Sequence, residues 1–282
     1  MTSLRVDGAR LSVHLQGEGP ALLLLHGFTG SNAMWTPHLA AFEGFTTVSV
    51  DLLGHGESDA PPTPNRYRME RCVDDLTSLL NHLEIERVAV LGYSMGGRVA
   101  LQLALRAPGR LWALVLESAS PGIDDDAERE DRVRSDAALA DEIERNGIDA
   151  FVDRWQALPL FASQSRLSAA AREELRRHRL RNSPVGLANS LRGAGAGQEA
   201  PVLNRLGEIR IPTLLIAGAL DQKYVALARK MSDALPCARM HVVPDAGHAT
   251  HLEQPEAFGR VVREFLREHI DAREGKEAPP CQ

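Results

Sequence analysis

Short apolar runs alternate along this chain with amphipathic stretches of helical length. Six runs are apolar almost throughout and end near glycine or a polar turn, as buried strands do: 21–27, 46–54, 88–94, 111–118, 213–221 and 240–248. Four stretches have apolar positions three and four residues apart: 69–83, 95–107, 225–235 and 255–270. Because strands without a polar side are covered on both faces, the pattern predicts an α/β fold, with a mostly parallel sheet between two layers of helices.

Three segments depart from this alternation. Residues 4–17 alternate apolar and polar positions, which predicts a β-hairpin. No strand-like run occurs from 122 to 202, and this segment is predicted to form several helices. An all-helical segment inside an α/β chain indicates an insertion, so we expect a core of 1–121 and 203–270 with a helical cap of 122–202. The polar end, 271–282, is expected to be a flexible tail.

Composition restricts the possible partners. The 282 residues carry a formal net charge of −6, which provides no basic surface for nucleic acid or an anionic membrane. No apolar run is long enough to span a bilayer. The three cysteines, Cys72, Cys237 and Cys281, are scattered and odd in number, which argues against a disulfide framework or a zinc site and for a reducing compartment. With no signal segment in the opening residues, we expect a cytoplasmic protein that uses no metal or other cofactor.

A G-x-S-x-G motif supplies the candidate nucleophile. GYSMG, residues 92–96, lies between a predicted strand and a predicted helix, where such a serine occupies a sharp, strained turn. In this kind of sheet an acid follows a later strand and a histidine follows the last one. Asp221 and His248 occupy these two positions. The histidine would take the proton of Ser94, and Asp221 would orient the imidazole.

Other residues compete with this triad or surround it. Asp245 is a weaker candidate for the acid because it is too close in sequence to the histidine, and His251 is the rival histidine. The side chains of His26, His55 and Ser58 are interpreted as holding turns rather than as a second site.

The loop HGFTG, residues 26–30, follows the first buried strand. A loop in this position can aim a backbone N–H group at the same point as the N–H group that follows the serine. We therefore assign the oxyanion hole to the backbone N–H groups of Phe28 and Met95.

Arg98 lies one helical turn after Ser94, so the two side chains share a face of the predicted helix. A cation in this place suits a substrate with a carboxylate, whereas a surface position or a salt bridge would be a purely structural explanation. Residues 165–193 of the cap are rich in arginine while its first half is acidic. Most of these arginines are therefore expected on a solvated face, with only one or two pointing inward.

Several motifs together resemble those of the α/β-hydrolase family over nearly the whole chain: HGFTGS, DLLGHGESD, GYSMGGRVA, the helical cap, LIAGALD and AGHATHLEQP. The resemblance implies an α/β-hydrolase fold, a serine triad and a mobile cap, but this fold hosts many reactions. GYSMGGRVA, the SPGIDDDAERE opening of the cap, FVDRWQALPLFASQ, SLRG and DQKY resemble a narrower family, the 2-succinyl-6-hydroxy-2,4-cyclohexadiene-1-carboxylate synthases of menaquinone biosynthesis.

The narrower resemblance implies a lyase that eliminates pyruvate from 2-succinyl-5-enolpyruvyl-6-hydroxy-3-cyclohexene-1-carboxylate. Ser94 would then relay a proton rather than become acylated. The substrate-binding residues that the resemblance implies are Tyr93, Arg98, Arg132, Trp155, Arg179 and Arg192. Neighbouring arginines compete for two of these positions, namely Arg129 and Arg134 with Arg132, and Arg176, Arg177 and Arg181 with Arg179.

Two other functions remain open at this point. A serine hydrolase, either a carboxylesterase or a C–C bond hydrolase acting on an acidic small molecule, would use the same triad. A non-catalytic receptor of the same fold is a third possibility, against which the intact serine, histidine and aspartate argue. The expected partner is a small-molecule polycarboxylate, with no nucleic acid and no insertion into a membrane.

Overall fold

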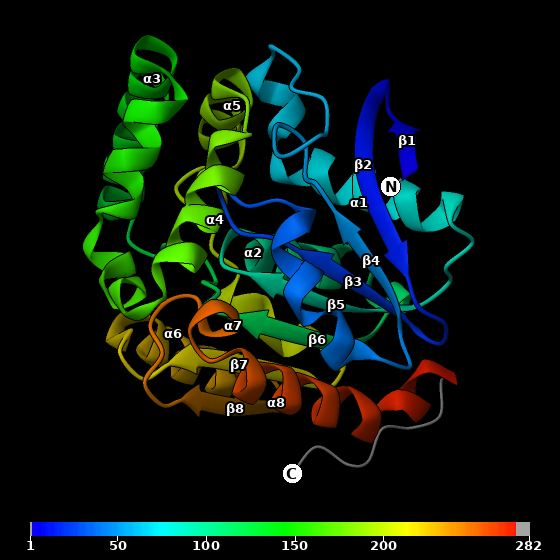
Figure 1. Ribbon diagram of the computed structural model, residues 1–282. Coiled ribbons are helices and arrows are strands. Elements are labelled where there is room, and N and C mark those ends of the chain that lie inside the picture. The colour runs from blue at the N-terminus through cyan, green and yellow to red at the C-terminus, as the bar shows by residue number, and fades with distance from the viewer. Residues whose placement is uncertain (1, 275–282) are drawn as a thin grey trace.

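The computed structural model describes residues 2–274, and this part of the chain contains one eight-stranded sheet in the order β1-β2-β4-β3-β5-β6-β7-β8 (Figure 1). The strands are β1 (Thr2–Val6), β2 (Ala9–Gln16), β3 (Ala21–Leu25), β4 (Thr46–Val50), β5 (Val88–Tyr93), β6 (Leu111–Glu117), β7 (Thr213–Gly218) and β8 (Ala238–Val243). The pairs β1–β2 and β2–β4 are antiparallel, and every other neighbouring pair is parallel. The predicted mostly parallel sheet is confirmed.

Helices cover both faces of the sheet, as the apolar strands predict. The α-helices outside the expected cap are α1 (Met69–His82), α2 (Met95–Arg106), α6 (Gln222–Ala234), α7 (Thr250–Glu253) and α8 (Pro255–Glu268). The 3₁₀-helices there are η1 (Asn32–Phe42), η2 (Pro64–Tyr67), η3 (Pro108–Arg110), η5 (Leu203–Glu208) and η6 (Ile270–Glu274).

The strand β3 shows why both layers are needed. Its side chains point alternately to the two faces. Leu23 and Leu25 pack with apolar residues of α1, α2 and α6, whereas Leu22 and Leu24 pack with those of η1 and α8. All four leucines are fully buried, and each such burial stabilises the fold by about 2 kcal/mol.

The N-terminal hairpin forms as predicted. Asp7 and Gly8 connect β1 to β2 with φ values of 45° and 77°, the left-handed conformations that a two-residue hairpin turn requires. The hairpin then extends the sheet, because β2 pairs with β4.

No strand occurs between 122 and 202, as expected. The helices of this segment are α3 (Asp126–Gln156), η4 (Pro159–Arg166), α4 (Ala169–Leu180) and α5 (Pro184–Ala194), and α3 is interrupted at Gly147, whose φ is 80°. Figure 1 shows α3, α4 and α5 grouped on one side of the molecule. The segment also contains an apolar cluster between α3 and α5. We propose on this basis that 122–202 is a cap on the core formed by 1–121 and 203–270.

The end of the core differs from expectation. Residues 271–274 belong to η6, and the Arg87 guanidinium donates hydrogen bonds to the carbonyl oxygens of Ala272 (2.6 Å) and Arg273 (2.9 Å). The expected flexible tail therefore does not begin at 271, because a cation from the loop before β5 holds these carbonyls. The remainder of that tail, 275–282, lies outside the described residues.

The cysteines also need a correction. Cys72 is a free thiol, but Cys237 is disulfide-bonded. An odd number of cysteines still permits one pair, so the cysteines do not support the expected reducing compartment.

Buried histidines make the fold sensitive to acid. His38, on η1, is 4% exposed among Trp35, His251 and Phe258. Burial and the neighbouring His251 lower its pKa to about 4, although Glu117 opposes this shift. The folded-state pKa thus lies below the unfolded value near 6.5, so the stability is fully present above about pH 6.5 and is lost as the pH falls towards 4.

We therefore expect His38→Phe to reduce the loss of unfolding free energy between pH 7 and pH 5 by about 2 kcal/mol. Urea unfolding at the two pH values measures this difference. The same replacement at the exposed His82 is the control. An unchanged pH dependence in His38→Phe would show that this histidine does not contribute to acid sensitivity.

Candidate active site

Ser94 lies at the sharp turn between β5 and α2. Its φ of 53° and ψ of −109° lie where side chains are rarely accommodated, at a cost of about 1–3 kcal/mol. Two glycines make the turn possible: a Cβ on Gly92 would overlap the backbone of Gly96, and a Cβ on Gly96 would overlap the carbonyl of Leu25. The Ser94 N–H donates to the Glu117 carbonyl oxygen at 2.8 Å, which ties the turn to β6.

The structure brings Ser94, His248 and Asp221 together in the predicted order. His248 Nε2 lies 3.1 Å from Ser94 Oγ, and His248 Nδ1 lies 2.8 Å from Asp221 Oδ2. Asp221 follows β7 and caps α6, while His248 follows β8, so both reach the site from the ends of neighbouring parallel strands. With Nδ1–H donating to Asp221, Nε2 presents its lone pair to the serine hydroxyl, as proton abstraction from Ser94 requires.

The rival acid and the rival histidine do not belong to the hydrogen-bonded series Ser94–His248–Asp221. His251 is fully buried, and its Nδ1 lies 2.8 Å from Glu117 Oε2. Asp245 is exposed in the turn after β8. The sequence preference for Asp221 and His248 therefore agrees with the geometry.

His26, His55 and Ser58 hold turns, as interpreted. His26 Nδ1 lies 2.8 Å from the Gly27 carbonyl oxygen, and His26 Nε2 accepts from the Leu52 N–H at 3.0 Å. His55 Nδ1 lies 3.2 Å from the Leu53 carbonyl oxygen. The Ser58 hydroxyl donates to the Asp51 carbonyl oxygen at 2.6 Å. Burial lowers the pKa of His26 and lowers that of His55 to about 3, so both rings are neutral at neutral pH.

The candidate oxyanion hole lies beside the serine. A Cβ on Gly27 would lie 3.5 Å from Ser94 Cβ, so the loop 26–30 runs next to the nucleophile. Neither the Phe28 N–H nor the Met95 N–H donates a hydrogen bond to another residue within 2–274. Both donors are thus available to an oxygen bound at the serine.

Arg179, on α4, is a buried cation. It is 5% exposed, and within residues 2–274 it forms no ion pair with an acidic side chain. Its guanidinium lies 5.2 Å from the centre of the Phe161 ring. Burial lowers the pKa of Arg179, although the Tyr93 phenol opposes this shift. A buried charge without a partner destabilises the protein, so an anion bound beside the Arg179 guanidinium would offset this cost.

A cavity of about 500 Å³ adjoins this arginine and is lined by residues between Gln156 and Arg179. Arg179, Phe161, Gln164 and Arg172 are among its lining residues. The Phe161 ring also packs against the His248 ring, with 6.0 Å between centres. Phe161 therefore lines this cavity and also contacts the histidine of the triad.

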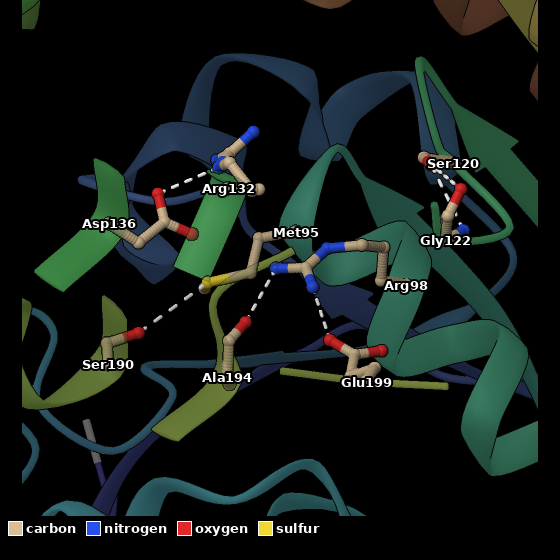
Figure 2. A network of polar contacts seen from close by, with 9 residues as sticks. All are labelled: Met95, Arg98, Ser120, Gly122, Arg132, Asp136, Ser190, Ala194 and Glu199. Carbon is tan, nitrogen blue, oxygen red and sulfur yellow. Dashed lines mark hydrogen bonds and ion pairs between the residues drawn. The ribbon is translucent and has the colours of Figure 1, made fainter. Parts of the chain in front are cut away.

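Arg98 is engaged within the protein (Figure 2). Its guanidinium forms an ion pair with Glu199 and donates to the Ala194 carbonyl oxygen at 2.8 Å. Both side chains of the pair are nearly buried, at 11% and 10% exposure. The structure thus contains the salt bridge that the sequence analysis named as the purely structural explanation for Arg98. Its partner is a buried acid that lies 101 residues away in the sequence.

Arg132 is more open. Its Nε donates to Asp136 Oδ1 at 2.8 Å, and its side chain is 44% exposed (Figure 2). Figure 2 shows Arg132 and Arg98 on either side of Met95. The terminal nitrogens of Arg132 have no bonding partner within residues 2–274, so they are free to bind an anion.

Arg192 does not join this group. Its guanidinium donates to Glu144 (2.9 and 2.7 Å) and to Asp141 (2.6 Å), which links α5 to α3. Arg192 was expected to contact substrate, but its guanidinium instead joins the helices α3 and α5.

Most of the competing arginines are also paired. The pairs are Arg129 with Asp126, Arg134 with Asp131, Arg176 with Asp153, and Arg177 with Glu174. Arg181 is exposed.

Aromatic residues pack together beside the triad. Trp155 packs against Phe28 (5.2 Å between ring centres) and Phe161 (5.8 Å), and its buried Nε1–H has no partner within residues 2–274. Tyr93 is nearly buried, and its ring lies 5.5 Å from the His248 ring. Burial and the Glu117 carboxylate raise the pKa of the Tyr93 phenol well above its usual value.

Two residues at the site were not among the sequence candidates. The Tyr224 ring lies 4.5 Å from the His248 ring. Burial raises the pKa of the Tyr224 phenol, although Arg98 and Arg132 oppose this rise. Its only sequence signal is its place in DQKY. Glu117 lies fully buried behind the site. Its signal is a single acid at the end of an otherwise apolar run, LWALVLES.

The described residues contain no group of three or more His, Cys, Asp or Glu side chains arranged to hold a metal ion. None of their helices has both the length and the apolar character needed to cross a membrane.

Comparison with known proteins places the chain in a family. The family model described as the alpha/beta hydrolase fold matches residues 20–255. A Bacillus subtilis protein named putative 2-succinyl-6-hydroxy-2,4-cyclohexadiene-1-carboxylate synthase is 45% identical, and the match covers 92% of this chain and 96% of that protein. A solved structure of MenH from S. aureus is 33% identical with a TM-score of 0.88, covering 92% of this chain and 98% of that one.

A second solved structure, the enol-lactonase from Burkholderia xenovorans, is 27% identical with a TM-score of 0.84, covering 95% of this chain and 100% of that one. The matched family model spans every strand from β3 to β8 and all three triad positions. The chain therefore belongs to the α/β-hydrolase family.

Proposed function

We propose that this enzyme eliminates pyruvate from 2-succinyl-5-enolpyruvyl-6-hydroxy-3-cyclohexene-1-carboxylate to give 2-succinyl-6-hydroxy-2,4-cyclohexadiene-1-carboxylate. The observation that carries the proposal is the buried Arg179, which has no acidic partner among the described residues and lies near the histidine of a Ser–His–Asp chain. The substrate is a polycarboxylate, so it supplies the missing anion. The B. subtilis relative bears the name of this synthase.

The reaction begins with a proton. His248 Nε2 takes the hydroxyl proton of Ser94, Asp221 stabilises the imidazolium, and the Ser94 oxygen removes the ring proton α to the succinyl ketone. The electron pair moves through the ring double bond and breaks the C–O bond to the enolpyruvyl group. The released enolpyruvate takes up one proton and becomes pyruvate. No water is consumed, and no bond forms between Ser94 and carbon.

The oxyanion hole has the same task here as in ester hydrolysis. Negative charge develops on the ketone oxygen as the enolate forms, and the Phe28 and Met95 N–H groups would donate to it. One such donor is worth about 3–4 kcal/mol of transition-state stabilisation. The Trp155 and Phe161 rings pack together near His248, and such apolar surroundings would lower the local dielectric and strengthen the interaction.

The four arginines of this region differ in how they would contribute to substrate binding. Arg179 meets one carboxylate from the cap, and the free terminal nitrogens of Arg132 meet another. Tyr93 lies beside the His248 ring and Trp155 beside the Phe28 ring, where each would contact the substrate. Arg98 would contact substrate only by exchanging Glu199 for a substrate carboxylate, and Arg192 stabilises the cap.

A serine hydrolase acting on an acidic ester or diketone is the alternative. The solved structure named an enol-lactonase has the same fold and is 27% identical, so a relative of this fold bears the name of a hydrolase. The same Ser94 would then attack a carbonyl and become acylated. The cytoplasmic location and the absence of nucleic acid and membrane partners remain predictions.

We expect the purified protein to release pyruvate from the enolpyruvyl substrate, with the absorbance of the conjugated diene rising in step. A coupled lactate dehydrogenase assay measures pyruvate. Ser94→Ala should lower the rate by at least about 10³-fold, because the proton relay is broken. Burst release of p-nitrophenol from an ester without any pyruvate release would favour the hydrolase.

Arg179→Met should weaken transition-state binding of the polycarboxylate by about 2–5 kcal/mol, measured as a loss of kcat/KM, because a desolvated charge pair is removed. The matched control is Arg192→Met, which removes a paired cap arginine and should leave kcat/KM within about fivefold of the wild type. Equal losses in the two variants would contradict an anion site at Arg179.

A further inference from the structure

Glu117 contacts both chain segments that carry the reacting side chains. It is the last residue of β6, is fully buried and has no place in the Ser–His–Asp chain. Its carbonyl oxygen accepts the Ser94 N–H at 2.8 Å, which fixes the strained turn that presents the serine. Its carboxylate binds the segment that begins two residues after His248.

The bonds to that segment are numerous and short. The Thr250 hydroxyl donates to Glu117 Oε1 at 2.6 Å, and the His251 N–H donates to the same oxygen at 2.9 Å. The His251 Nδ1–H donates to Oε2 at 2.8 Å. A buried carboxylate is costly unless its lone pairs accept hydrogen bonds, and here the donors are the first two residues of α7.

The charge at this position is maintained. Burial alone would raise the pKa of Glu117, but His251 and Thr250 outweigh burial and hold the pKa below its usual range. The titratable groups that face the pair are Tyr93 on β5 and His38 on η1, whose rings lie 4.7 Å and 5.5 Å from the His251 ring. Glu117 is therefore ionised at neutral pH.

The contact continues from His251 to the catalytic histidine through an aromatic ring. Tyr93 packs against His251 on one side and against His248 on the other, at 4.7 Å and 5.5 Å between ring centres. Glu253, the last residue of α7, accepts from the Gly247 N–H at 2.8 Å, but it lies only six residues from Gly247 in the sequence. Glu117 reaches the start of α7 from β6, 133 residues earlier.

We propose that Glu117 is a positioning residue that sets the distance between Ser94 and His248. It binds the serine turn through its backbone and the start of α7, two residues after His248, through its carboxylate. The inference rests on the proposed function for the role of Ser94 and His248. It does not depend on whether the reaction is elimination or hydrolysis.

Two replacements separate hydrogen bonding from charge. Glu117→Ala removes every bond to Thr250 and His251. In Glu117→Gln the amide oxygen still accepts from the Thr250 hydroxyl and the His251 N–H, while the negative charge is lost. A geometric role therefore predicts loss in the alanine variant and rescue in the glutamine variant.

The test measures the rate at which a fluorophosphonate probe labels Ser94 in the full-length protein, together with kcat and KM for pyruvate release. We expect Glu117→Ala to lower both the labelling rate and kcat about 100-fold with little change in KM, since a misplacement of about 1 Å costs that much. Glu117→Gln should stay within roughly fivefold of the wild type. Labelling does not depend on which substrate is correct, so failure of this inference is distinguishable from failure of the proposed reaction.

Asp75→Ala is the matched control. Asp75 is a nearly buried acid on α1, paired with Arg66 at 2.7 Å and bonded to no residue of the site. It should lower thermal stability without changing the labelling rate. Should Glu117→Ala fail to fold, Thr250→Val removes one of the bonds and should slow labelling about tenfold. Wild-type labelling rates in a folded Glu117→Ala, or in Thr250→Val, would overturn the proposal.

Discussion

The backbone strain at Ser94 is the constraint on which the site depends. The serine reaches out of the sheet only because α2 begins directly against β5, and this close approach is possible only without side chains at Gly92 and Gly96. The cost of the turn is of order 1–3 kcal/mol and must be met by the surrounding sheet. The fully buried strands β3, β5 and β6 supply that support.

Opposite charges divide the site into two halves. Asp221 lies on the core side of His248, where its negative charge stabilises and orients an imidazole that accepts a proton. Arg179 and Arg132 lie on the cap side, where positive charge would hold a polycarboxylate. Such a division suits a reaction that moves a proton towards the core while an anionic substrate stays fixed by the cap.

Sequence patterns predicted the sheet, the hairpin and the three triad positions, because these follow from local apolar runs and glycine turns. The roles of the arginines could not be predicted in the same way. Arg98 and Arg192 are paired with Glu199 and with Asp141, acids far away in sequence, and only the fold brings each pair together. Glu117 was missed for a related reason, since its partners lie on α7, 133 residues later.

The central claim is that this site breaks a C–O bond by elimination and does not use water. The most direct measurement is the mass of the organic products formed from the enolpyruvyl substrate in ¹⁸O-labelled water. The account predicts a cyclohexadiene product that contains no ¹⁸O and retains its succinyl group. A carboxylic acid product that carries oxygen from water, such as labelled succinate, would contradict it.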